Sequence, residues 1–277
     1  MKKLNFLLVL LLSFMFLGCF KPNSNENLRI NNKTNEEIYN NSNEEKDNLN
    51  NDIKVYNDDS KEEEKESNKE NITVVIDPGH SEKGDLNKEP MAPNSKVLKI
   101  KDEGGTVGDY SKVPEYKTCM DISLILKDLL ERSGFNVIMT KTDNNMSLGN
   151  IERAKVGNDV NADLVIRIHA DSFDDNKVNG ASVLVPEKNN ENTEKIADLS
   201  KQYGEIILNS YCNSLGIENR GVFLKGDMTG FNWSKVPVVL FEMGFLSNEK
   251  DDNFISNENN HEKIAKAIYS GICKCFS

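Results

Sequence analysis

After position 70, the apolar residues of this chain follow two alternating patterns. Residues 72–76 form a continuous β-branched run that stops at the Asp-Pro-Gly of residues 77–79, which is typical of a buried strand followed by a sharp turn. Residues 115–132 instead carry apolar side chains at helical spacing and are followed by Ser133 and Gly134, which predicts a helix with a glycine stop.

The same alternation continues to the end of the chain. It predicts further strands at 136–140, 162–168, 180–185 and 237–241, and further helices at 151–160, 193–215 and 260–272. Such alternation indicates an α/β fold, a three-layer sandwich in which helices flank a twisted, mostly parallel central sheet. The direction of each strand stays open. In sheets of this kind ligands bind beyond the carboxyl ends of the strands.

The first residues differ sharply from this region. Lys2 and Lys3 precede an apolar run, residues 4–17, which is short for a membrane span and resembles the middle of an export signal. Residues 16–19 resemble a bacterial lipoprotein box, in which the cysteine is lipidated and becomes the mature N-terminus. We therefore expect a lipoprotein signal peptide at 1–19 and a membrane anchor through a lipid on Cys19. An uncleaved anchor helix and an ordinary signal peptide are the alternatives, and each places the rest of the chain outside the cytoplasm.

Residues 20–70 are dominated by Asn, Glu, Lys, Asp and Ser, and their few apolar residues show no period. Such a segment cannot bury enough surface to offset its ordering entropy. We expect a disordered polar tether here, with a small extra domain as the alternative. Residues 71–277 are long enough for one domain with a substantial core.

Charge and cysteine content exclude some classes of protein. The net charge of −11, from 34 basic and 45 acidic residues without a basic tract, argues against nucleic acid as a partner. The four cysteines after Cys19 have no metal-knuckle spacing, because Cys273 and Cys275 are separated by one residue. We expect buried thiols, and a disulfide in this oxidising compartment stays open.

Two of the three histidines follow predicted strands. His80 comes after the first strand and its turn, and His169 comes directly after the strand at 162–168. Glu115 opens the first helix, where a structural role at the helix dipole is the alternative. Glu242 ends an apolar strand, where an unpaired carboxylate is costly to bury. Two imidazoles and one carboxylate suit a catalytic zinc ion with one open position, and a further carboxylate is then left over as a base.

Five sequence blocks around these residues occur in the order found in a known family. From Val74 to about Tyr269 the chain resembles the zinc-dependent N-acetylmuramoyl-L-alanine amidases of the Amidase_3 type. The blocks that carry the resemblance are Ile76–His80 (IDPGH), Val113–Tyr116 (VPEY), Ile151–Ala154 (IERA), Ala162–Asp171 (ADLVIRIHAD) and Val239–Asn248 (VLFEMGFLSN).

The resemblance implies a substrate and a role for each residue. The substrate is peptidoglycan, and the bond cut is the amide between the lactyl group of N-acetylmuramic acid and L-alanine. One Zn²⁺ is held by the residues that match the family's ligands, His80, Glu115 and His169. Glu242 matches the catalytic acid/base, which takes the proton of the attacking water and passes it to the departing L-alanine nitrogen.

The chain departs from the family pattern between its first two ligands. His80 and Glu115 lie further apart than in the shortest members, and Glu103 in this interval is the nearest competitor for the carboxylate ligand. Tyr116 stands where many members have lysine.

Supporting roles are expected for four more residues. Asp77 orients the turn or His80, and Arg153 packs its helix, pairs with an acid or contacts substrate. Asp171 and Asn248 lie near the rim of the site, where capping a helix is the alternative. His261, before the last helix, is expected to be solvated.

Three other functions share part of this pattern. A zinc peptidase acting on the stem peptide normally has a glutamate three residues after its first histidine, but Lys83 stands there. A non-haem iron oxygenase would use a pair such as His169 and Asp171 on a β-sandwich, which the alternating helices contradict. A catalytically inactive wall-binding lipoprotein would not need the spare carboxylate of Glu242.

Overall fold

The computed structural model describes residues 69–277, and its strands form two sheets. The strands are β1 (Thr73–Pro78), β2 (Asp85–Pro90), β3 (Leu98–Asp102), β4 (Asn136–Met139), β5 (Leu164–Asp171), β6 (Ala181–Pro186), β7 (Asn219–Lys225) and β8 (Val238–Phe245). The main sheet has the order β4-β1-β5-β8-β6-β7, and β2 and β3 form a separate antiparallel hairpin. Within the main sheet only the pairing of β6 with β8 is antiparallel. The expected α/β fold with a mostly parallel sheet is confirmed.

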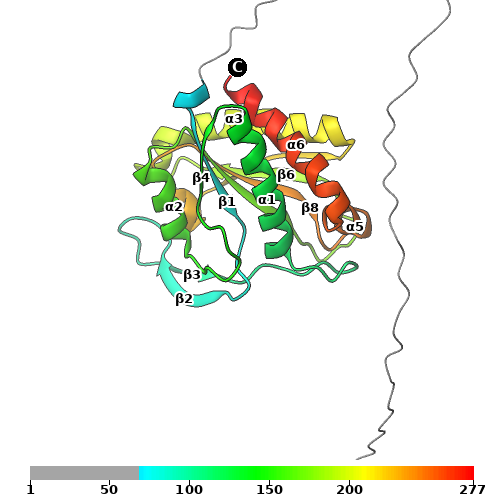
Figure 1. Cartoon of the computed structure of the whole chain (residues 1–277). Coiled ribbons are helices and arrows are strands. Elements are labelled where there is room, and N and C mark those ends of the chain that lie inside the picture. The colour runs from blue at the N-terminus through cyan, green and yellow to red at the C-terminus, as the bar shows by residue number, and fades with distance from the viewer. Residues whose placement is uncertain (1–68) are drawn as a thin grey trace, which may run out of the picture. The chain divides into compact units, whose positions relative to one another are not determined.

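Helices cover both faces of the main sheet. They are the 3₁₀ turn η1 (Lys69–Asn71), α1 (Glu115–Arg132), α2 (Asn150–Asp159), α3 (Thr193–Leu215), α4 (Thr229–Asn232), α5 (Glu249–Ile255) and α6 (Glu258–Cys275). Figure 1 shows α1 and α6 side by side over one face of the sheet, with the β2–β3 hairpin projecting at one end. Each long helix lies within a few residues of its predicted position.

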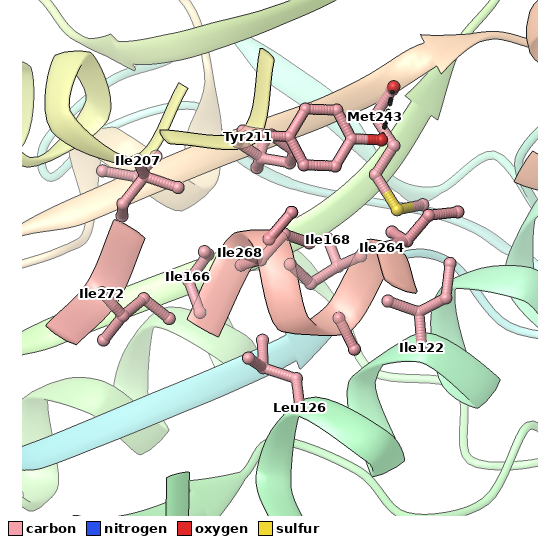
Figure 2. Packing of buried hydrophobic residues seen from close by; sticks show 14 of the residues in the cluster. Ile122, Leu126, Ile166, Ile168, Ile207, Tyr211, Met243, Ile264, Ile268 and Ile272 are labelled. Carbon is pink, nitrogen blue, oxygen red and sulfur yellow. Dashed lines mark hydrogen bonds between the residues drawn. The ribbon is translucent and has the colours of Figure 1, made fainter. Parts of the chain in front are cut away.

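The larger core lies between the sheet and helices α1, α3 and α6 (Figure 2). Ile166 and Ile168 of β5 meet Ile122 of α1 and Ile268 of α6 there, and all four are fully buried. Burying a side chain of this size stabilises the fold by about 1.5–3 kcal/mol. Gly271 lets α6 approach α3, because a Cβ at that position would lie 2.7 Å from the Cα of Ile207.

The opposite face carries a smaller core and the polar site. Successive residues of a strand point to opposite faces, so Val165, Arg167 and His169 of β5 share the face that α2 and α4 cover in part. Val165 packs there against Val238, Leu240 and Phe231. Because α2 and α4 are short helices, this face of the sheet stays open towards the carboxyl ends of β5 and β8.

Besides the short turn η1, five elements were not expected from the sequence, namely β2 and β3 of the hairpin, β7, α4 and α5. The polar sequence of β2 has no apolar alternation, and α4 and α5 have only 4 and 7 residues. Contacts with distant segments hold the hairpin instead. The Glu89 carboxylate accepts the Asn150 N–H at 2.7 Å, and the Trp233 ring N–H donates to the Pro90 carbonyl at 2.9 Å.

The structure contradicts the expectation for His261 and describes the state of four cysteines. His261 is buried rather than solvated, since it lies on the inner side of α6 near the start of that helix, and its Nε2 is 3.1 Å from the Ile255 carbonyl. The cysteines at 119, 212, 273 and 275 are all free thiols. Among residues 69–277, no helix combines the length and the apolar character that a membrane span requires. The expected signal peptide, Cys19 and almost all of the expected tether fall outside the described residues.

Candidate metal centre and active site

The backbone turn at Gly79 brings His80 close to His169. Gly79 follows β1, and a Cβ at this position would lie 2.7 Å from the ring of His169 and 2.8 Å from the Ile168 carbonyl. Gly105 approaches from the other side with a φ of +74°, and a Cβ there would meet the His80 ring at 2.8 Å. Only glycine permits both approaches, so the glycines beside His80 are needed for its position.

His80, Glu115 and His169 come together at one point. Glu115 Oε1 lies 3.3 Å from His80 Nε2 and 3.1 Å from His169 Nδ1, and the ligand atoms of all three residues lie within 4.8 Å of one another. The two imidazole rings are nearly perpendicular, with centroids 4.9 Å apart. The remaining oxygen of Glu115 accepts the Thr106 N–H at 3.1 Å, which fixes the carboxylate.

The electrostatics of this group suit a divalent cation. Burial disfavours the charged form of His80, but hydrogen bonds with Asp102 and Glu115 outweigh it and raise the pKa of His80 to about 9. Burial lowers the pKa of His169 to about 4 against the pull of Glu115. Burial works against ionised Glu115, yet its bonds with both imidazoles hold the pKa of Glu115 well below its usual range. In the protein without a metal ion, His80 therefore carries a proton. The two imidazoles and the carboxylate together form a donor set that fits zinc.

Three buried atoms in and beside the group have no hydrogen-bond partner among the described residues. They are His169 Nε2, Glu242 Oε2 and Asp102 Oδ2, and their residues line one cavity. Buried polar atoms are normally satisfied, so these atoms mark a place for a ligand. Among the described residues, His80, Glu115 and His169 are the group able to hold a metal, and Glu103 lies outside it on the cavity rim.

Glu242 lies next to the candidate ligands without joining them. It occupies the middle of β8 and pairs in register with His169 of β5 on one side and Ser182 of β6 on the other. Burial raises the pKa of Glu242 well above its usual range, and the charges of Glu115 and Asp171 add to this effect. A buried, unpartnered carboxyl group with a raised pKa is suited to proton transfer.

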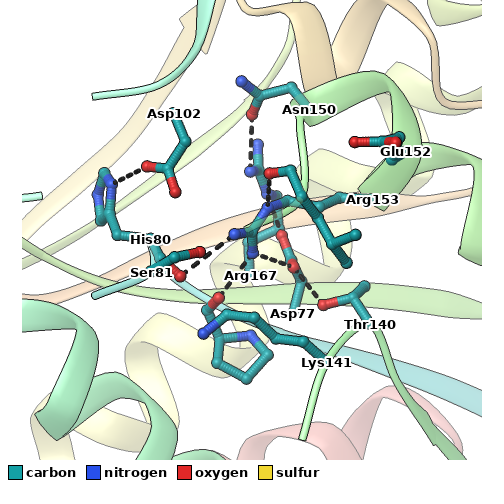
Figure 3. Close-up of polar contacts among 12 residues, drawn as sticks. Asp77, His80, Ser81, Asp102, Thr140, Lys141, Asn150, Glu152, Arg153 and Arg167 are labelled. Atoms are coloured by element: carbon teal, nitrogen blue, oxygen red, sulfur yellow. Dashed lines mark hydrogen bonds and ion pairs between the residues drawn. The ribbon is translucent and has the colours of Figure 1, made fainter. Parts of the chain in front are cut away.

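Asp77 organises the turn before His80 rather than contacting His80 itself. Its carboxylate binds Arg153 and Arg167, each at 2.7 Å, and accepts the Thr140 hydroxyl (Figure 3). Burial disfavours ionised Asp77, but the charges of Arg153 and Arg167 outweigh it and hold its pKa well below the usual range. Arg153 also donates to the carbonyls of Pro78 and His80 at 2.8 and 3.2 Å. Asp77 and Arg153 thus hold the backbone that presents His80.

The carboxylate that does contact His80 is Asp102, which the sequence did not single out. Its Oδ1 lies 3.1 Å from His80 Nδ1 and also accepts the Gly104 N–H at 2.9 Å (Figure 3). A carboxylate on the second nitrogen of a ligand histidine fixes its tautomer and orientation. The acidic pair Asp102-Glu103 just before Gly104 and Gly105 was the only signal in the sequence.

Two other expected residues, Asp171 and Asn248, do not line the cavity over the candidate ligands. Asp171 ends β5, where burial raises its pKa. Asn248 caps α5, since its side chain accepts the Lys250 and Asp251 N–H groups, so it holds a helix instead of reaching the site. A cavity of about 280 Å³ opens over the group, and its wall includes Lys101 and Asp102 of the β2–β3 hairpin and Asn150 of α2.

The chain is similar to bacterial cell wall amidases. The probable cell wall amidase LytH of Staphylococcus saprophyticus is 26% identical over 197 residues, which cover 67% of this chain and 62% of LytH. The germination-specific N-acetylmuramoyl-L-alanine amidase of Bacillus subtilis is 26% identical over 188 residues, covering 63% and 75% of the two chains. The chain therefore spans only about three fifths of the length of LytH.

Solved structures show the same fold. The crystal structure of the N-acetylmuramyl-L-alanine amidase Ami1 from Mycobacterium smegmatis superimposes with a TM-score of 0.69 at 25% identity, covering 76% of this chain and 99% of Ami1. Residues 74–274, which include the whole candidate site, match the family described as N-acetylmuramoyl-L-alanine amidase. By this match and by the fold, the chain belongs to the Amidase_3 family.

Proposed function

We propose that this protein hydrolyses the amide bond between the lactyl group of N-acetylmuramic acid and L-alanine in peptidoglycan, with one zinc ion held by His80, Glu115 and His169. The observation that carries the proposal is the convergence of three donor atoms within 4.8 Å beside the unpartnered carboxyl group of Glu242. A ligand group and a separate proton carrier are the two parts that metal-assisted amide hydrolysis requires.

A zinc ion in this group would supply Lewis acidity, which makes water nucleophilic near neutral pH and polarises an amide carbonyl. Glu242 accepts the proton of the attacking water through Oε2, which has no hydrogen-bond partner within residues 69–277. It then delivers that proton to the nitrogen of L-alanine, which must leave as an amine. The products are a free lactyl carboxylate on the glycan and a free peptide amine.

The surrounding residues keep these groups in place. Asp102 fixes the ring of His80 through Nδ1, so that Nε2 faces Glu115. Asp77 and the two arginines hold the turn that carries His80. Glu89 places the β2–β3 hairpin as a wall of the cavity through its bond to the start of α2. Small displacements of such groups reduce catalysis, because reacting atoms must meet in a narrow geometry.

We also propose that the enzyme acts on the wall from the outer face of the membrane. The similar proteins described as cell wall amidases support extracytoplasmic action. The signal peptide at 1–19, a lipid on Cys19 and a tether over residues 20–70 rest on the sequence alone. The lipid would concentrate the enzyme at the membrane next to its peptidoglycan substrate.

Mass spectrometry of digested peptidoglycan tests the reaction. Zinc-loaded protein should release intact stem peptides with a free L-alanine amine and leave lactyl carboxylates on the glycan. Cleavage inside the stem peptide would instead make the protein a zinc peptidase. Binding to the wall without any new termini would make it an inactive wall-binding lipoprotein.

A further inference from the structure

A second cavity lies beyond Glu242 on the same face of the main sheet. Its volume is about 290 Å³, and its lining includes Leu184 of β6, Phe223 and Lys225 of β7, and Phe245 of β8. Ser182, which also lines it, pairs in register with Glu242, and Leu184 pairs with Leu240. Directly paired residues of a sheet point to the same side. Glu242 and Leu240 line the metal-site cavity, so the two cavities adjoin along β8.

The second cavity has an apolar floor that is open to solvent. Phe173 and Phe223 of its lining are 58% and 45% exposed, and Phe245 and Leu184 also line it. Exposed aromatic residues that gather in a concave site are typical of binding surfaces. This floor can take the methyl and methylene groups of a ligand.

This cavity holds two cations, Arg220 and Lys225, and one carboxylate, Asp171, whose charge acts on both of them without a direct ion pair. Arg220 lies over the Phe245 ring at 5.3 Å and donates to the Asn179 carbonyl, and neither Arg220 nor Lys225 forms an ion pair within residues 69–277. The one acid in the lining is Asp171, whose Oδ1 accepts the Ser172 N–H at 2.7 Å. The cavity therefore presents a surplus of positive charge in a chain whose net charge is −11.

The metal-site cavity has the opposite character. Its arginines, Arg153 and Arg167, are both bound to Asp77, and its lysine, Lys101, pairs with Asp85 at 3.5 Å. Asp102 and Glu103 form part of its wall. Free cations on one side of Glu242 and acids on the other would orient a substrate whose two halves differ in charge.

We propose that the cavity between β6, β7 and β8 binds the acidic stem peptide, and that the uncharged acetylated glycan lies on the side of the β2–β3 hairpin. This assignment rests on the proposed amidase function. The scissile amide joins neutral sugars to a peptide that carries free carboxylates and alanine methyl groups. Arg220 and Lys225 match the carboxylates, and Phe223 and Leu184 match the apolar groups.

The spacing of the strands agrees with a stem peptide that runs from Glu242 across β6 towards β7. Neighbouring strands lie about 4.8 Å apart, so β6 and β7 are about 5 and 10 Å from the strand of Glu242. An extended peptide advances about 3.3–3.6 Å per residue. The second and third residues of the stem peptide therefore reach Arg220 and Lys225 when L-alanine lies beside Glu242.

Cleavage of matched substrates tests the assignment in the full zinc-loaded protein. The substrates are N-acetylmuramoyl-L-alaninamide, the N-acetylmuramoyl tetrapeptide, and the same tetrapeptide with its carboxylates amidated. The measured quantity is the ratio of kcat/KM for each tetrapeptide to kcat/KM for the alaninamide. In the double variant Arg220→Gln, Lys225→Gln we expect this ratio to fall about tenfold for the acidic tetrapeptide, mainly through KM. It should change little for the amidated one.

A matched control removes the same charge elsewhere. Lys263→Gln with Lys266→Gln on α6 should leave every ratio unchanged, and Phe223→Ser should lower the ratio for both tetrapeptides. Equal ratios in wild type and the Arg220, Lys225 variant overturn the assignment, and so does an equal loss for the acidic and the amidated tetrapeptide. A wild-type protein that cleaves none of the substrates overturns the amidase function itself.

Discussion

Glu242 of β8 lies directly opposite His169 of β5 in the parallel pairing of the two strands. Adjacent strands therefore hold a candidate metal ligand and a carboxyl group at fixed spacing, and both point to the open face of the sheet. This carboxyl group has no hydrogen-bond partner in the described part of the chain. The backbone hydrogen bonds of two buried strands keep this pair in place, so a substitution in one side chain need not displace the other.

Metal binding and proton transfer should separate by substitution. His169→Ala and Glu115→Ala each remove a proposed ligand, so both should lose zinc and activity. Glu242→Gln keeps the ligands and should retain stoichiometric zinc while its activity falls by a factor of about 10² to 10⁴. Elemental analysis and release of peptide amines from peptidoglycan measure the two properties. A Glu242→Gln protein without metal would make Glu242 a ligand.

Asp102→Asn should weaken zinc binding by about 10- to 100-fold, because the amide no longer stabilises the orientation and charge of the His80 ring. Chelator competition measures the affinity. Glu103→Gln is the matched control, since Glu103 lines the same cavity without a bond to His80. Equal effects of the two substitutions would show that the loss comes from the charge of the cavity wall and not from contact with His80.

Asp77→Asn should destabilise the fold by about 3–5 kcal/mol, because it leaves Arg153 and Arg167 buried without their counter-ion. The native pKa of Asp77 is depressed against burial by these arginines. The contribution of ionised Asp77 to the free energy of unfolding is therefore present above the usual carboxyl pKa of about 4. It is lost as the pH falls below that value. Urea unfolding measures the loss, and Glu131→Gln, in an exposed pair with Lys127, should change stability by less than about 1 kcal/mol.

The metal-free protein should lose stability as the pH rises from 6.5 to 9. The folded-state pKa of His80 is raised to about 9 by Asp102 and Glu115 against burial, so its contribution is complete below 6.5 and is lost as the pH rises through 9. His169, whose pKa burial lowers to about 4, acts below 6.5 and there reduces stability as the pH falls. Melting temperatures of chelated protein measure this profile.

Zinc-loaded protein should show a flatter profile over the same range, because its imidazoles carry no exchangeable ligand proton. Chelated His80→Gln should also lose the decline between pH 6.5 and 9. If the decline persisted unchanged in that variant, a group other than His80 would be responsible for it.

Cys19→Ala should move the protein from the membrane fraction to the secreted fraction or leave an unprocessed precursor, because the lipid attachment point is absent. Fractionation and immunoblotting measure the change. A Ser13→Ala variant, altered outside the Gly18-Cys19 box, should fractionate like wild type. If Cys19→Ala also behaves like wild type, no lipid is attached at Cys19.

The longer helices, most strands of the main sheet and the positions of the candidate site residues were predictable from local patterns. The β-branched run at 72–76 and the helical spacing of 115–132 each reflect burial of a continuous face, which the sequence encodes directly. His80, His169 and Glu242 each stand at or near the end of such an apolar run. Parallel strands place these ends at one edge of the sheet, so their convergence followed from the fold class.

Tertiary contacts decided what surrounds those residues. The β2–β3 hairpin has no apolar period and is held by Glu89 at the start of α2 and by Trp233, which are far from it in sequence. Asp102 reaches His80 only because that hairpin folds back over the site. Polar bonds of this kind depend on distance and direction in space and leave no periodic trace along the chain. Arg220 and Lys225 likewise line a cavity only because β7 pairs at the edge of the sheet beyond Glu242.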